Sequence, residues 1–177
     1  MDFALPPDGD PRRASVRSWL AEHPKPSAPE LAEAGYVAPH WPRPWGMAAD
    51  PETQLIVDDE LKRAVIKRPT NTIGIGWAGP TIIRAGSEEQ KDRYLGPMLS
   101  AEEIWCQLFS EPGAGSDLAS LTTRAEQDGD EWVVNGQKVW TSGGQHANLG
   151  MLLARTDPEV PKHQGITYFA FEMIQPG

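Results

Sequence analysis

The fold is decided by the stretch Trp105-Cys106-Gln107-Leu108-Phe109-Ser110-Glu111-Pro112-Gly113-Ala114-Gly115-Ser116-Asp117. In its first residues, Cys106 and Leu108 alternate with Trp105, Gln107 and Phe109. Both sets are mostly apolar, which is typical of a strand buried on both faces. The proline and the glycines that follow predict a sharp elbow whose backbone can closely approach a ligand. Exposed N–H groups and a serine hydroxyl in such a turn suit a phosphate or a ring oxygen. From these residues alone, a binding loop and an ordinary turn are equally good interpretations.

Length and charge limit the classes of function. With 177 residues, the chain is long enough for one ordinary domain or two small ones. A net charge of −9 and a pI near 4.9 argue against a nucleic-acid-binding or anionic-membrane surface. Any anionic ligand must therefore be held by local donors. Cys106 is the only cysteine, which excludes an intramolecular disulfide and favours a small buried apolar residue.

The sequence shows no targeting, membrane or metal signal. The N-terminus lacks the basic start and apolar segment of a signal peptide, and no stretch approaches the about 20 apolar residues of a membrane span. We therefore expect a cytoplasmic protein without a membrane span. The four histidines are scattered without metal-ligand spacing, so no metal site is predicted.

The first part of the chain reads as helices and loops. Asp-Pro pairs at 10–11 and 50–51 predict helix starts, and Ser87 with Gln90 predicts a capping box. A short helix is expected from Glu30 to Gly35. The helix after Pro51 is predicted to bury a periodic apolar set, namely Leu55, Ile56, Leu61, Ala64 and Val65. The glycines at 74, 76 and 79 lack a dinucleotide fingerprint and indicate close helix packing.

From residue 104 onward the pattern is that of strands. Strands are expected at 122–127 and 131–135 around the Asp128-Gly129 turn, and then at 137–140, 149–155 and 166–171. Because the expected helices come first in the chain and the expected strands follow, the sequence predicts an α+β fold. An all-α domain, residues 1–103, is followed by an antiparallel β-barrel-like domain, residues 104–177, which is incomplete at its C-terminus.

Three groups of residues closely resemble the signature of acyl-CoA dehydrogenases. They are the stretches 79–95, 107–117 and 125–142, and the likeness runs from about Ala34 to the last residue. Members of that family continue well beyond this point, finishing the β-domain and adding a C-terminal helical bundle. The chain thus resembles the N-terminal part of such an enzyme.

The resemblance implies FAD as cofactor and α,β-dehydrogenation of an acyl-CoA thioester to the 2-enoyl-CoA. It places the backbone of Gln107 and Phe109 along the flavin ring and the Ser110 hydroxyl at its pyrimidine end. Ser116 would reach a flavin phosphate or the pantetheine arm of the substrate. The whole cofactor set implied by the resemblance is Gln107, Phe109, Ser110, Gly115, Ser116, Trp140, Thr141 and Ser142. Among these, the Trp140 indole would pack on the ring and the Ser142 hydroxyl would lie near N5.

The remaining expectations concern catalysis and partners. Glu111 and Asp117 are expected to cap turns and to pair with nearby N–H or Arg groups, a reading favoured over proton transfer. The resemblance places the catalytic base in the C-terminal domain, so no catalytic residue is assigned here. It also implies a homo- or hetero-oligomer with an electron-transfer flavoprotein as electron acceptor. The alternative is a non-catalytic partner subunit, or an inactive truncated remnant, of a heteromeric enzyme.

Overall fold

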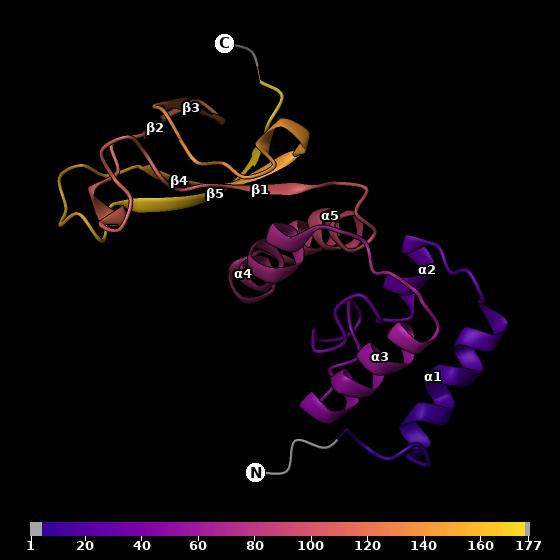
Figure 1. The fold of residues 1–177 in the computed structure, drawn as a ribbon. Coiled ribbons are helices and arrows are strands. Elements are labelled where there is room, and N and C mark those ends of the chain that lie inside the picture. Colours follow the sequence, from indigo (N-terminus) through magenta and orange to yellow (C-terminus); the bar gives the residue numbers. More distant parts are fainter. Residues whose placement is uncertain (1–4, 176–177) are drawn as a thin grey trace. The chain divides into compact units, whose positions relative to one another are not determined.

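The computed structural model describes residues 5–175 and divides the chain into two compact units, residues 1–102 and 103–177. Within the described residues, no helix is long and apolar enough to cross a membrane. The first unit is helical, as expected from its sequence. Its elements are α1 (Pro11–Glu22), α2 (Ala28–Glu33), α3 (Pro51–Arg63), the π-helical segment η1 (Gly74–Ala78), α4 (Gly79–Ala85) and α5 (Glu88–Leu99) (Figure 1).

Side-chain caps begin these helices where the sequence predicts them. The Asp10 carboxylate accepts from the Arg12 N–H at 2.9 Å, and Asp50 accepts from the Thr53 N–H at 2.7 Å. Ser87 and Gln90 cap each other's backbone N–H groups and form the predicted capping box. The predicted start of one helix was wrong. Helix α2 begins at Ala28, before the predicted Glu30, because Ser27 supplies a capping box of its own.

The core of the first unit includes side chains from α1 and α3, which lie side by side (Figure 1). Val16 of α1 and Ile56, Val57 and Leu61 of α3 are buried. The predicted apolar set of α3 is partly wrong, since Leu55 is 47% and Val65 is 81% exposed. Helix α3 ends at Arg63, so Val65 lies beyond it, where the backbone is left-handed with φ 59°.

The glycines near α4 confirm the expected close packing in part, since Gly74 and Gly79 are tightly packed and Gly76 is not. A Cβ at Gly79 would collide with Cζ2 and Cη2 of Trp41 and would lie 3.0 Å from Sδ of Met98. Trp41 itself is buried. A Cβ at Gly76 would meet no atom within 4 Å, so only Gly79 of these two is required by packing.

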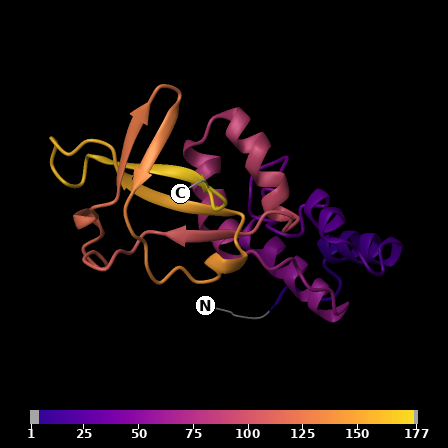
Figure 2. The same cartoon turned by 90° about the horizontal axis from the view of Figure 1, so that it is seen from above.

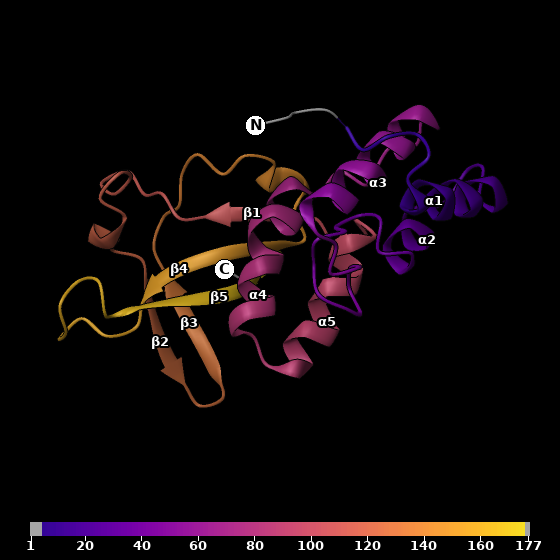
Figure 3. The same ribbon diagram turned by 90° about the horizontal axis from the view of Figure 1, so that it is seen from below.

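The second unit is a five-stranded sheet. Its strands are β1 (Trp105–Leu108), β2 (Arg124–Asp128), β3 (Glu131–Asn135), β4 (Leu149–Arg155) and β5 (Ile166–Glu172), and short 3₁₀ turns lie at η2 (Leu118–Ser120) and η3 (Gly144–His146). The order is β1-β4-β2-β3, with β5 paired along the whole of β4 (Figure 3). The hairpin of β2 and β3 meets β4 at one end, where Arg124 pairs with Arg155 (Figure 2).

The sheet is mixed, which corrects the expectation of an antiparallel domain. Strands β1 and β4 are parallel, with Trp105 opposite Leu149 and Leu108 opposite Leu152. The cause is the long return of the chain, because residues 141–148 lead back to the start of β1. There the N–H groups of Asn148 and Leu149 both donate to the Ile104 carbonyl oxygen.

A further correction concerns residues 137–140, which form no strand. Trp140 adopts a left-handed conformation with φ 60°, which a regular strand does not contain. The Lys138 ammonium donates to the Phe109 carbonyl oxygen at 3.0 Å and ties this segment to the elbow instead. The sheet core is formed by Cys106, Leu108, Ala125, Leu152 and Ala154, so the predicted burial of Cys106 is confirmed.

Candidate functional site

The elbow after β1 is a tight turn that leaves a loop exposed. The N–H of Glu111 donates to the Ala114 carbonyl oxygen at 2.8 Å, and the Ala114 N–H donates back at 3.1 Å. This pairing closes the turn around Pro112 and Gly113. A Cβ at Gly113 or Gly115 would meet no atom within 4 Å, so the backbone here faces open space. The turn therefore leaves room beside Gly113 and Gly115 for a ligand to approach the backbone closely.

A buried carboxylate secures the base of the elbow. The Glu111 carboxylate accepts from the Thr122 N–H at 2.7 Å, the Thr122 hydroxyl at 2.7 Å and the Thr123 N–H at 2.9 Å. The Lys138 ammonium completes the set with an ion pair of 2.9 Å. Burial opposes ionisation of Glu111, but hydrogen bonds from Thr123, Thr122 and Lys138 outweigh it and hold the pKa of this carboxyl well below its usual range.

A second segment, residues 139–142, lies against the elbow. The Val139 N–H donates to the Ser110 carbonyl oxygen at 2.9 Å. The next residue, Trp140, is 90% exposed, an extreme value for so large an apolar side chain. Thr141 is half-buried and Ser142 is exposed. The exposed Trp140 indole and the hydroxyls of Thr141 and Ser142 therefore come directly after the residue that is hydrogen-bonded to the elbow.

The predicted cofactor residues occupy these two segments. Gln107 lies in β1 opposite Met151, and both Gln107 and the following Phe109 are half-buried. Ser110 is half-buried, while Gly115 and Ser116 are exposed. The bond between Val139 and Ser110 brings the group 107–116 next to the group 140–142, so the structure collects the predicted residues in one region of the second unit.

Glu111 accepts backbone N–H groups as expected, whereas Asp117 caps no backbone N–H of η2, and the partner cations of both carboxylates are lysines and not arginines. Asp117 pairs with the Lys162 ammonium at 2.7 Å and accepts from the Ser120 hydroxyl. The Lys162 hydrogen bond, followed by that of Ser120, lowers the pKa of Asp117. Both partners of this pair are about half exposed, in contrast to Glu111 and Lys138.

Lys138 was missed by sequence reasoning. A signal was present, because Lys138 is the only lysine or arginine between Arg124 and Arg155. A single cation in a segment expected to be a strand, downstream of the Glu111 carboxylate that was expected to need a partner, indicates an ion pair between the two residues. The distance of 27 residues from Glu111 hides the contact from local patterns.

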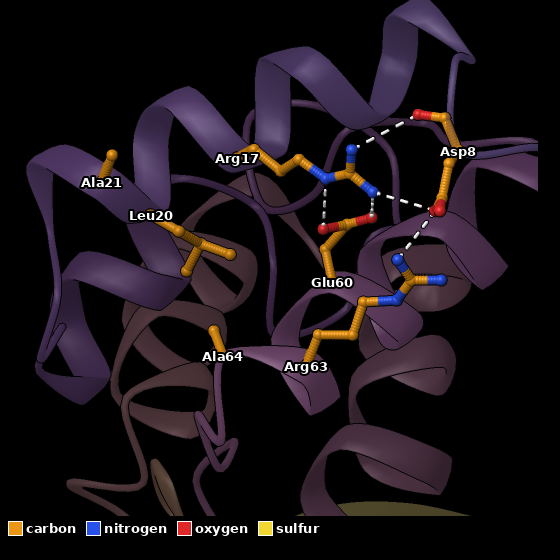
Figure 4. Close-up of a pocket in the computed structure, with 7 residues that line it drawn as sticks. All are labelled: Asp8, Arg17, Leu20, Ala21, Glu60, Arg63 and Ala64. Carbon is orange, nitrogen blue, oxygen red and sulfur yellow. Dashed lines mark hydrogen bonds and ion pairs between the residues drawn. The ribbon is translucent and has the colours of Figure 1, made fainter.

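A separate cavity of about 550 Å³ lies in the first unit (Figure 4). Arg17 holds Glu60 through two hydrogen bonds of 2.8 Å, and Asp8 accepts from both Arg17 and Arg63. Hydrogen bonds from Arg17 keep the pKa of Glu60 below its usual range despite burial. Each charged group in this cavity is therefore already paired with another, and the network joins α1 to α3.

Cys106 and the metal-ligating types of side chain add no further site within the described residues. Burial raises the pKa of the Cys106 thiol, which disfavours a reactive thiolate. Within residues 5–175, no group of three or more His, Cys, Asp or Glu side chains is arranged to hold a metal ion.

Comparison with known proteins gives a consistent assignment. The chain matches the family model of the acyl-CoA dehydrogenase N-terminal domain over residues 10–102 and that of the middle domain over residues 106–177. Acyl-CoA dehydrogenase FadE34 of Mycobacterium tuberculosis is 53% identical over 147 residues, a match that covers 83% of this chain and 20% of the relative. Acyl-CoA dehydrogenase IpdE1 of the same organism is 41% identical over 148 residues, covering 83% of this chain and 38% of the relative.

Solved structures agree with the sequence matches. The Tcur3481-Tcur3483 steroid ACAD is similar with a TM-score of 0.73 and 34% identity, covering 97% of this chain and 49% of that one. The ChsE4-ChsE5 complex from Mycobacterium tuberculosis gives a TM-score of 0.72 and 34% identity, covering 97% and 48%. The chain thus spans about half of these structures and less of the curated relatives. With both family models matched over nearly its whole length, the chain belongs to the acyl-CoA dehydrogenase family.

Proposed function

We propose that this chain is the N-terminal portion of an FAD-dependent acyl-CoA dehydrogenase that oxidises the Cα–Cβ bond of a thioester to the 2-enoyl-CoA. The observation that carries the proposal is the exposed Trp140 next to an open glycine elbow, within a family match over both units. An indole that is 90% exposed has an open face on which a flat aromatic partner can stack.

The residues present fit FAD by the chemistry of their donors. An isoalloxazine ring needs an apolar face and several neutral hydrogen-bonding groups at its edges. Trp140 supplies the face, and the hydroxyls of Ser110, Thr141 and Ser142 supply edge groups in the adjoining segments. When bound, FAD accepts the hydride that leaves Cβ of the substrate.

We assign each predicted residue a role in holding that cofactor. The backbone of Gln107 and Phe109 lines the ring, and Ser110 bonds its pyrimidine end. Trp140 stacks on the ring. Gly115 allows close approach of the backbone, and Ser116 bonds a flavin phosphate or the pantetheine arm of the substrate. The Ser142 hydroxyl would lie near N5, and Thr141 would be a further cofactor-binding residue beside it. No residue of this chain is assigned as the catalytic base.

The substrate class is inferred from the similar structures. One of them is described as a steroid ACAD, and at 34% identity it covers 97% of this chain. We therefore propose a steroid-bearing acyl-CoA as substrate. We also propose an electron-transfer flavoprotein as electron acceptor, as the resemblance to the family implies.

The second candidate function is that of a non-catalytic subunit in a heteromeric dehydrogenase. It is favoured by the similarity to two assemblies whose descriptions each name two different components. In that case this chain would shape a shared site while the partner supplies the base.

The visible absorbance spectrum tests both candidates. The protein encoded by the complete gene is purified, and spectra are recorded before and after anaerobic addition of straight-chain and steroid acyl-CoA thioesters. Bleaching of a flavin spectrum by the steroid thioester supports the first candidate with its substrate class. Flavin that no thioester bleaches favours the non-catalytic subunit, and bleaching by straight chains alone overturns the steroid assignment. A protein without flavin overturns the proposed function.

A further inference from the structure

Glu111 and Lys138 form a buried ion pair between the two segments assigned to flavin. Their side chains are 3% and 8% exposed, and Oε1 of Glu111 lies 2.9 Å from Nζ of Lys138. Lys138 also donates to the Phe109 carbonyl oxygen at 3.0 Å. One ammonium group thus contacts the chain immediately before Ser110 while its own backbone leads directly to Val139 and Trp140.

The carboxylate side of the pair reaches a third segment. Glu111 accepts the N–H groups of Thr122 and Thr123, which precede β2. The packing is close there, because a Cβ at Gly136 would lie 2.7 Å from Cα of Thr123. The pair therefore joins the elbow, the entry to β2 and the exit from β3 through one set of charged hydrogen bonds.

The Thr122 and Thr123 donors already partner both carboxylate oxygens of Glu111. Lys138 supplies the positive charge that compensates the buried carboxylate. It also adds a link along the chain, which a turn cap with any other counter-charge would not provide. Its bonds to Phe109 and Glu111 act together with the bond from Val139 to Ser110.

We propose that Glu111 and Lys138 are positioning residues, which fix Ser110 and Trp140 relative to each other so that hydroxyl and indole meet one flavin ring. This inference rests on the proposed flavin site. The pair itself touches neither substrate nor cofactor and acts through the two segments that it joins.

Lys138→Met is the first test, because it removes the charge and keeps much of the side-chain length. Asp117→Asn is the matched control, since it weakens a half-exposed ion pair on the same elbow. Amide hydrogen exchange of the 177-residue chain, measured without any cofactor, shows how firmly the elbow and the segment after Lys138 are held together. We expect the Val139 and Thr123 amides to exchange roughly tenfold faster or more in Lys138→Met, and within about twofold of the parent rate in the control.

Flavin binding is the second readout, measured on the protein from the complete gene. We expect the Kd for FAD to rise roughly tenfold or more in Lys138→Met, with a changed visible circular dichroism of the bound flavin. The double variant Glu111→Gln/Lys138→Met buries no unpaired charge. It should regain thermal stability relative to Lys138→Met while its FAD affinity stays low.

The outcomes separate this inference from the proposed function. If the double variant regains FAD affinity together with stability, the pair has only a structural role and the inference falls. It also falls if folded Lys138→Met binds FAD within about twofold of the parent. If the parent protein binds no FAD, the proposed function fails, and amide exchange still decides whether the pair fixes the two segments.

Discussion

Replacing Gly79 by alanine should destabilise the helical unit, whereas the same change at Gly76 should not. The two glycines lie three residues apart at η1 and the start of α4. A Cβ at Gly79 would enter the van der Waals shell of the Trp41 ring, which is 2% exposed and has little room to move. A Cβ at Gly76 would meet nothing within 4 Å.

The expected magnitudes follow from two opposing effects. Alanine in place of a helical glycine restricts the unfolded chain and stabilises by about 0.5–1 kcal/mol where it fits. Overpacking a filled core costs about 1–3 kcal/mol, and contact with a buried ring lies at the upper end. Gly79→Ala should therefore lose about 1–2 kcal/mol, and Gly76→Ala should gain up to about 1 kcal/mol. For a chain of this size the gap of about 1–3 kcal/mol corresponds to roughly 2–12 °C in Tm.

Thermal and urea unfolding of the 177-residue chain, followed by far-UV circular dichroism, measures both variants. Trp41→Phe then tests the cause, because the smaller ring removes the atoms that the new methyl group meets. The free energy of unfolding of the double variant Gly79→Ala/Trp41→Phe should be higher than the sum of the two single effects predicts. The reasoning is refuted if Gly79→Ala is as stable as Gly76→Ala, or if the cycle is additive within about 0.5 kcal/mol.

Three further predictions address the site and the helix caps. Trp140→Ala should leave folding unchanged, because the side chain is 90% exposed, and should weaken FAD retention on gel filtration; unchanged FAD occupancy would refute the placement of the ring. The folded-state pKa of Glu111 lies below its ordinary value of 4.5, so its stabilisation is present above about pH 4.5 and is lost as pH falls. The stability gap between the parent and Glu111→Gln in urea should thus shrink from about pH 7 to about pH 3, and a constant gap would contradict this sign. Ser87→Ala should cost about 1 kcal/mol in urea unfolding by removing the acceptor for the Gln90 N–H, while Ser87→Asp should retain most of that stability.

Helix starts were predictable because their chemistry is local. Asp10, Asp50 and Ser87 each cap an N–H two or three residues ahead, a contact that the sequence displays directly. Strand β4 was predicted with its observed bounds because its apolar run is long and ends at Arg155. The burial of α3 was predicted less well, because periodicity continued past the point where the helix ends.

Strand pairing and the geometry of the site were not local. The parallel register of β1 and β4 joins residues 44 positions apart, such as Trp105 and Leu149, and no turn signal marks it. Residues 137–140 have a strand-like composition, yet Lys138 bonds to groups 27 and 29 positions away and Trp140 turns left-handed. The resemblance supplied the identities of the candidate residues, while the contacts that hold them required the fold.

The charge of the elbow explains why this geometry matters for the proposed site. The chain carries a net charge of −9, so its overall field does not favour an anionic cofactor. Two lysines contact the elbow, but Lys138 is paired with Glu111 and Lys162 with Asp117. The proposed flavin residues are all uncharged, so beyond the stacking of Trp140 the polar recognition must come from hydroxyl and N–H dipoles. Dipoles act only over short distances and at suitable angles, and a shift of the elbow would therefore cost more affinity than a change in net charge.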